Sequence, residues 1–242
     1  MPTLLQLDTS ADTEGSVSRA VTATFADAWA GLGTDHVIIR RDLHADPLPH
    51  LADAALHWPA RLRRPGANPP AEAEALQQQV LDELISVDAV VIGAPMYNYS
   101  LPSVLKVWLD HIHVPGVTAP FDGDSRPMAG KPAVIISSRG GIYDPGSDNA
   151  DWDHTIPPLQ IILGNALGMD VSVITISRTL SDMVPGLSAE AGRAAEELRA
   201  AHQRAADLAR EIGGRTLPGL TGSPDQSPTC SSRPEVISTS SA

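Results

Sequence analysis

The sequence predicts an α/β fold: a doubly wound, three-layer sandwich in which a five-stranded parallel sheet lies between two layers of helices. The first observation is that five short apolar runs alternate with longer segments of helical periodicity along the 242 residues. The second is that runs such as AVVIG and AVIISS are apolar at nearly every position, as expected of strands buried on both faces. Right-handed crossovers then place helices on both sides of the sheet.

Each expected element has its own local signal. In the first helix Val21, Phe25 and Trp29 share one face. Pro102 suits the first turn of the third helix. Gly213-Gly214 is expected to end the last helix. We expect strands at residues 3–8, 36–42, 89–93, 133–138 and 171–176. We expect helices at residues 18–32, 71–87, 102–113, 156–167 and 188–212.

Two segments depart from this alternation. Residues 43–70 are rich in proline and small or polar residues, which indicates a long irregular excursion. From Arg215 onward Ser, Thr, Pro and Gly dominate, so this segment contains too few apolar residues to form a core. We therefore expect one domain over residues 1–214 and a disordered tail over residues 215–242.

Composition excludes several classes of function. A net charge of −12 argues against nucleic acid or an anionic membrane surface as partner. The single cysteine, Cys230, permits no disulfide within the chain. Because neither a signal-like leader nor an apolar stretch of membrane-spanning length is present, we expect a cytoplasmic protein with no membrane partner. His111, His113 and His154 lack carboxylates at a suitable spacing, so we expect no metal site.

Ligands of doubly wound sheets bind beyond the carboxyl ends of the strands, where three loops have unusual compositions. The first loop runs from Thr9 to Arg19 and contains Ser10, Ser16 and Ser18. Its hydroxyls and the amides entering the helix, such as that of Val17, suit a phosphate group. The alternative interpretation is an ordinary helix start capped by serine.

The second loop runs from Ala94 to Pro102 directly after a buried strand, and its segment Pro95–Tyr99 (PMYNY) carries two of the nine aromatic residues. Met96, Tyr97 and Tyr99 offer flat, polarisable surface to an aromatic ring system, and Asn98 offers a donor and an acceptor to a heterocycle. The alternative is a packed strand-to-helix turn in which the tyrosines close the core.

The third loop runs from Ser137 to Gly146 after the fourth strand and contains Ser138-Arg139-Gly140-Gly141. Two adjacent glycines let the backbone approach a ligand closely, and Ser138 and Arg139 could form hydrogen bonds to ring carbonyls or nitrogens. The alternative is a flexible surface turn. Placement of all three loops on the same sheet edge favours the ligand-binding interpretation over each alternative.

Over residues 3–212 the chain resembles the FMN-dependent NADH azoreductases, a branch of the flavodoxin-like quinone reductases. The resemblance is carried by Ala94–Tyr99 and Ser138–Gly141, with further support from Asp42-Leu43, Gly116-Val117-Thr118 and Gly130-Lys131. It implies a flavodoxin-like sandwich with strand order 2-1-3-4-5. It also implies bound FMN, NADH or NADPH as the hydride donor, and a homodimer in which the partner subunit completes each FMN site.

The resemblance also assigns expected roles to residues. Ser10, Ser16 and Ser18, with Val17 between them, match the phosphate loop. Pro95, Met96, Tyr97, Asn98 and Tyr99 match the segment along the isoalloxazine ring, and Ser138, Arg139, Gly140 and Gly141 match the loop at its pyrimidine side. Val17 stands where the family often has Gln, and Tyr143 stands where it often has His.

Together these features predict an FMN-dependent NAD(P)H oxidoreductase that reduces azo compounds or quinones by a ping-pong mechanism. Tyr143 is the side chain we expect to contact the small aromatic acceptor. Three alternatives stay open: a flavin-dependent reductase or dehydratase of a biosynthetic pathway, a flavodoxin-type electron carrier, and a flavin-free interaction protein. The changes at Val17 and Tyr143 motivate the first of these.

Overall fold

The structure is a computed structural model that describes residues 1–144 and 146–215. The predicted tail lies outside the described residues, except for Arg215, which belongs to the last helix. Cys230 also lies outside them.

The sheet has the predicted strands and the predicted order. All neighbouring strands are parallel, and their order is β2-β1-β3-β4-β5. The bounds are β1 (Thr3–Asp8), β2 (Val37–Asp42), β3 (Ala89–Gly93), β4 (Pro132–Ser138) and β5 (Asp170–Ile176). The chain moves outward to β2 and then returns past β1 to β3, so the topological switch point lies between β1 and β3.

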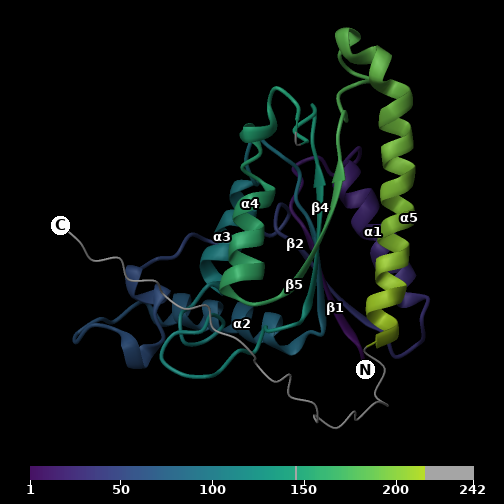
Figure 1. The fold of residues 1–242 in the computed structure, drawn as a ribbon. Coiled ribbons are helices and arrows are strands. Elements are labelled where there is room, and N and C mark those ends of the chain that lie inside the picture. Colours follow the sequence, from purple (N-terminus) through teal and green to yellow (C-terminus); the bar gives the residue numbers. More distant parts are fainter. Residues whose placement is uncertain (145, 216–242) are drawn as a thin grey trace, which may run out of the picture.

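Helices cover both faces of the sheet, as Figure 1 shows. On one face lie α1 (Val17–Ala30) and α5 (Ala191–Arg215), which pack against each other. On the other lie α2 (Ala71–Ser86), α3 (Ser103–Ile112) and α4 (Ile156–Leu159), which continues as the π-helical segment η4 (Gln160–Ala166). The two resulting cores contain Phe25 and Trp29 on the α1 side and Trp108 on the α3 side, all fully buried.

The last helix differs from its predicted bounds at both ends. A short helical segment, η5 (Pro185–Glu190), precedes α5, and α5 continues through Gly213-Gly214 to Arg215. The reason is packing: a Cβ on Gly213 would lie 2.3 Å from Leu32 Cδ1 and 3.2 Å from the Trp29 ring. Gly213 therefore lets α5 approach α1 closely and does not end the helix.

The excursion after β2 is more regular than its composition suggests. It contains two short 3-10 helices, η1 (Ala54–His57) and η2 (Ala60–Leu62). Asp53 caps η1 by accepting a hydrogen bond from the Ala55 amide at 2.7 Å. Arg63 donates to the carbonyls of Ala55 and Trp58 at 3.2 and 3.0 Å, which ties the two short helices together.

Two negative findings hold for residues 1–144 and 146–215. No helix there is both long and apolar enough to cross a membrane. Within the same ranges no three His, Cys, Asp or Glu side chains gather in a way that could hold a metal ion. His111 is buried, and its Nε2 lies 2.9 Å from the Pro49 carbonyl, to which it donates.

Candidate functional site

The three loops singled out in the sequence lie at one edge of the sheet. They leave the carboxyl ends of β1, β3 and β4, which are neighbours in the parallel sheet. The loop after β4 continues to α4 through a one-turn helix, η3 (Ala150–Trp152), and returns to the same edge. Because the strand order reverses here, the position is the one at which this fold binds ligands.

The loop after β1 has the chemistry of an anion site. Ser16 caps α1 by accepting a hydrogen bond from the Arg19 amide at 3.3 Å, and its hydroxyl lies 3.2 Å from that of Ser18. Ser10 and Ser18 are buried. The first amides of a helix have no partner within it and carry the positive end of its dipole. The Ser16 and Ser18 hydroxyls at the start of the helix, with Ser10 in the same loop, therefore suit a phosphate monoester.

Sequence reasoning missed the residue that shapes this loop, Arg19. Its Nε and Nη2 both donate to the Ser10 carbonyl, at 3.2 and 2.6 Å. The same guanidinium makes a bidentate pair with Asp42 at 2.7 and 2.9 Å, and hydrogen bonds from Arg19 lower the pKa of Asp42 to about 2. Because Asp42 neutralises it, Arg19 positions the loop more than it adds free positive charge.

Asp8, at the end of β1, lies beneath the same loop. Burial raises the pKa of its carboxyl above 3.8, against the lowering effect of a 2.7 Å hydrogen bond from the Thr22 hydroxyl. On the solvent side Asp12 accepts hydrogen bonds from the amides of Glu14 and Gly15, which lower its pKa. The Asp8 carboxyl beneath the loop is therefore a weaker acid than the Asp12 carboxyl on its solvent side.

The segment after β3 forms a tight hairpin turn. The amides and carbonyls of Tyr97 and Ser100 pair reciprocally at 2.9 and 3.0 Å. The two residues between them have positive φ, 49° at Asn98 and 69° at Tyr99, as a type I′ turn requires. Positive φ at a tyrosine costs free energy, and such strain concentrates at functional sites. The turn leaves Tyr97, Asn98 and Tyr99 exposed at the sheet edge.

Hydrogen bonds join this turn to the loops on either side. The Tyr97 hydroxyl lies 3.0 Å from Ser10 Oγ and accepts from the Ala11 amide at 2.9 Å. On the other side the Met96 amide donates to the Ser138 carbonyl at 2.8 Å. The structure therefore brings together the three predicted segments, with Pro95 buried beneath the turn.

Arg139 lies in the third loop, and its side chain pairs with residues of the protein. The guanidinium is 3 % exposed and is paired with Asp144 at 2.5 Å and Asp153 at 3.3 Å. It also donates to the Ser177 hydroxyl at 2.8 Å. Nη1 and Nη2 thus have protein partners, whereas the buried Nε has none among the described residues, so a hydrogen bond from Arg139 to a ligand ring stays a prediction. Its backbone remains at the predicted edge.

The glycines of the third loop make room for protein side chains. A Cβ on Gly140 would lie 2.7 Å from Leu180 Cδ1, and one on Gly141 would lie 3.4 Å from the Tyr143 ring. Tyr143 thus packs directly against the loop, with the Arg139 guanidinium 5.9 Å from its ring centroid. A cavity of about 460 Å³, lined in part by Gly140, Gly141 and Arg178, opens beside them.

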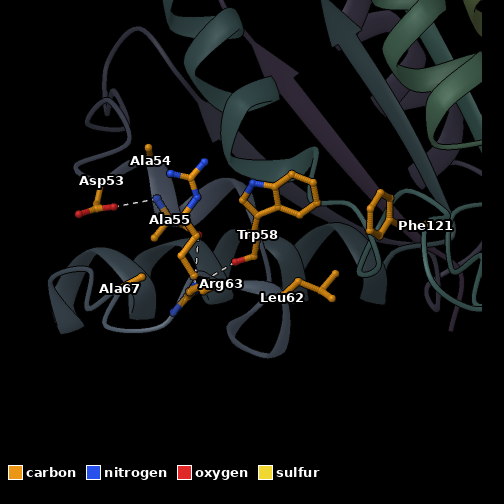
Figure 2. Close-up of a pocket in the computed structure, with 9 residues that line it drawn as sticks. Asp53, Ala54, Ala55, Trp58, Leu62, Arg63, Ala67 and Phe121 are labelled. Carbon is orange, nitrogen blue, oxygen red and sulfur yellow. Dashed lines mark hydrogen bonds between the residues drawn. The ribbon is translucent and has the colours of Figure 1, made fainter.

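A larger cavity of about 640 Å³ involves none of the predicted site residues. Trp58, Leu62 and Arg63 of the excursion line it together with Phe121, as Figure 2 shows. The rings of Trp58 and Phe121 meet edge to face at 5.3 Å and both are exposed. No feature of the sequence distinguished this pair, because its members lie more than sixty residues apart.

The fold and the loops define a member of the flavodoxin-like class, and comparison with known proteins agrees. The family model described as "Flavodoxin-like fold" matches residues 2–206. The chain belongs to this family.

Two curated relatives share one name. A protein of Kineococcus radiotolerans called FMN-dependent NADH:quinone oxidoreductase is 55% identical over 212 residues, spanning 88% of this chain and 100% of the relative. One of Streptomyces avermitilis with the same name is 38% identical over 224 residues, spanning 89% and 99%.

Solved structures agree in fold. A Bacillus anthracis azoreductase has a TM-score of 0.72 at 20% identity, over 87% of this chain and all of that one. An FMN-dependent NADH-azoreductase of the same species, solved with FMN, has a TM-score of 0.69 at 21% identity, over 88% and 100%.

Proposed function

We propose that this protein is an FMN-dependent NADH oxidoreductase that reduces quinones, azo compounds or both by a ping-pong mechanism. The observation that carries the proposal is the Tyr97 hydroxyl, which joins a helix-capped anion loop to an aromatic turn at the switch point. FMN has a phosphate monoester at one end and a flat ring system at the other, so both halves of the site fit it. The name shared by the relatives that are 55% and 38% identical supports the same donor and acceptor.

We assign the binding roles by position. Ser16, Ser18 and the Val17 amide, which lie at the N-terminus of α1, would hold the phosphate together with Ser10 of the same loop. The segment Pro95–Tyr99 would lie along the ring, and Ser138, the Arg139 backbone, Gly140 and Gly141 would lie at its pyrimidine side. When bound, FMN supplies the two-electron chemistry that amino-acid side chains lack.

The chain's own residues bind and orient in this mechanism. Tyr97 and Arg19 hold the phosphate loop in register with the aromatic turn. Nicotinamide and acceptor would occupy the same exposed surface in turn, which is the physical basis of ping-pong kinetics. Tyr143 would contact the acceptor because its ring packs on Gly141 at the loop edge. Solvent can deliver the protons that the reduced acceptor takes up, so no protein acid is required.

The proposal includes a homodimer in which each subunit completes the other's site. Its support is the aromatic patch of Trp58 and Phe121, exposed by 37% and 60%. Arg61 holds the patch together by pairing with Asp122 at 2.6 Å and donating to the Gly116 carbonyl at 3.0 Å. A rigid, exposed aromatic pair is typical of subunit interfaces. We also propose a cytoplasmic location, where NADH is available, and a folded domain over residues 1–214.

The dimer can be tested by light scattering on the purified chain. Phe121→Asp would place a charge in the patch and is expected to give monomers with weaker FMN binding. Met183→Asp adds the same charge at a side chain that is 77% exposed and is the matched control. A monomeric wild type, or a Phe121→Asp variant that stays dimeric, would contradict this part of the proposal.

The activity is tested by incubating the protein with FMN, removing the excess and recording the absorbance spectrum. Anaerobic NADH should bleach the bound flavin, NADPH should be compared, and a quinone should restore the colour. Initial rates at several fixed acceptor concentrations should give parallel reciprocal plots. Failure to take up FMN would favour an interaction protein, and slow reduction by NADH would favour an electron carrier. Rapid reduction without turnover of quinones or azo compounds would favour a biosynthetic enzyme.

A further inference from the structure

Three aromatic side chains from two loops form a row at the ring end of the candidate site. Tyr143 packs against Gly141, and the Tyr99 ring centroid lies 6.4 Å from that of Tyr143 at an interplanar angle of 72°. The Trp152 ring lies 5.3 Å beyond Tyr99 at 90°. The three rings are therefore in contact in the order Tyr143, Tyr99, Trp152, with Tyr143 packed against Gly141.

The position of Trp152 is fixed by its neighbours in the chain. The His154 amide donates to the Tyr99 carbonyl at 2.9 Å, and the Ser100 hydroxyl donates to the His154 carbonyl at 3.1 Å. Asp153 pairs with the buried Arg139 and also accepts hydrogen bonds from the amides that begin α4. The segment that carries Trp152 is thus bound both to the aromatic turn and to the Gly-Gly loop.

Trp152 is fixed but incompletely covered. The side chain is 50% exposed and Tyr99 is 47% exposed, whereas Trp29 and Trp108 of the two cores are fully buried. A tryptophan that only supported the loop would gain more stability by burying its whole ring. Because its ring contacts Tyr99, the half-exposed indole lies next to the turn that we place along the flavin ring.

We propose that Trp152 is a specificity-determining residue that contacts the second ring of an extended planar acceptor. The inference rests on the proposed function. An acceptor with one ring, held at the Gly141 end, meets Tyr143 first and does not extend to Trp152. A fused two-ring quinone or the distal aryl ring of an azo compound extends along the row and can pack against the indole. The substrate class is therefore multi-ring aromatic acceptors in preference to single-ring ones.

The test compares 1,4-naphthoquinone with 1,4-benzoquinone in the FMN-loaded wild type, Trp152→Ala and Trp152→Phe. In Trp152→Ala, kcat/KM for naphthoquinone should fall about tenfold, the effect of losing one aromatic contact, while that for benzoquinone should change less than twofold. Trp152→Phe should recover most of the loss. For each quinone, kcat/KM of a variant is divided by that of the wild type. This ratio cancels the difference in reduction potential between the two quinones. Met183→Ala, which removes another exposed apolar side chain, is the control and should change neither value.

Two further measurements separate the possible failures. Anaerobic reduction of bound FMN by NADH should proceed at the same rate in all variants, and FMN affinity should be unchanged. Equal losses for both quinones, no loss for either, or weaker FMN binding by Trp152→Ala would overturn the role of Trp152. If NADH does not reduce the wild type at all, the proposed function itself fails, and that outcome is recognised before any variant is compared.

Discussion

The ion pair between Arg19 and Asp42 makes stability depend on pH in a defined direction. We consider Asp42→Asn, which removes the charge of the carboxylate. The variant keeps an oxygen for the His44 and Ala45 amides, which donate to Asp42 at 3.0 and 3.1 Å. What it loses is the charge-assisted bidentate pair with Arg19 at 2.7 and 2.9 Å.

The magnitude follows from the pKa of Asp42. The fall of that pKa from 3.8 to about 2 sets an upper bound of about 2.5 kcal/mol on the stabilisation, at ~1.4 kcal/mol for each pH unit. The Asp42 side chain is 34% exposed, so water screens the pair, and we expect about 1 kcal/mol. Because the folded-state pKa is lowered, this stabilisation is fully present above about pH 4 and disappears as the pH falls towards 2.

The assay is urea unfolding followed by circular dichroism at several pH values from 7 down to 3. Wild type should exceed Asp42→Asn by about 1 kcal/mol at pH 7, and the difference should shrink steadily below pH 4. Asp110→Asn is the control, since Asp110 pairs with Lys106 on an exposed helix surface and should show almost no difference. A difference between wild type and Asp42→Asn that stays constant, or grows, as the pH falls would refute the reasoning.

Three further predictions concern the sheet edge. Tyr97→Phe should weaken FMN binding about fivefold to tenfold in a fluorescence titration, because the hydroxyl that contacts Ser10 and the Ala11 amide is lost; unchanged affinity would remove Tyr97 from the phosphate loop. Arg139→Met should lower the free energy of unfolding by roughly 3 kcal/mol, since Asp153 would keep a largely buried, unpaired charge; adding Asp153→Asn should recover part of the loss. Gly93→Ala should cost about 1–2 kcal/mol in thermal or urea unfolding, because its Cβ would lie 3.2 Å from the side chains of Asp8 and Thr22.

Much of this architecture is encoded locally. Runs such as Ala89–Gly93 are apolar at every position, and only a strand buried on both faces requires that pattern. Five such runs separated by helices predict the parallel sheet, and the parallel sheet brings Ser10, Tyr97 and Ser138 to one edge. The resemblance carried by Ala94–Tyr99 and Ser138–Gly141 then specified the strand order and the class, which the family match confirms.

The partners of individual side chains were decided only by the tertiary structure. Nothing in the sequence indicated that Arg139 pairs with Asp153 and Ser177, which the fold brings close to it. Gly213 looked like a helix terminator, but α5 packs on Trp29 there and needs the missing Cβ. Sequence periodicity indicates which residues of a helix or strand are buried. It does not indicate which distant residues cover them. For the same reason the sequence did not predict the contacts of Tyr99 with Tyr143 and Trp152, which belong to a different loop.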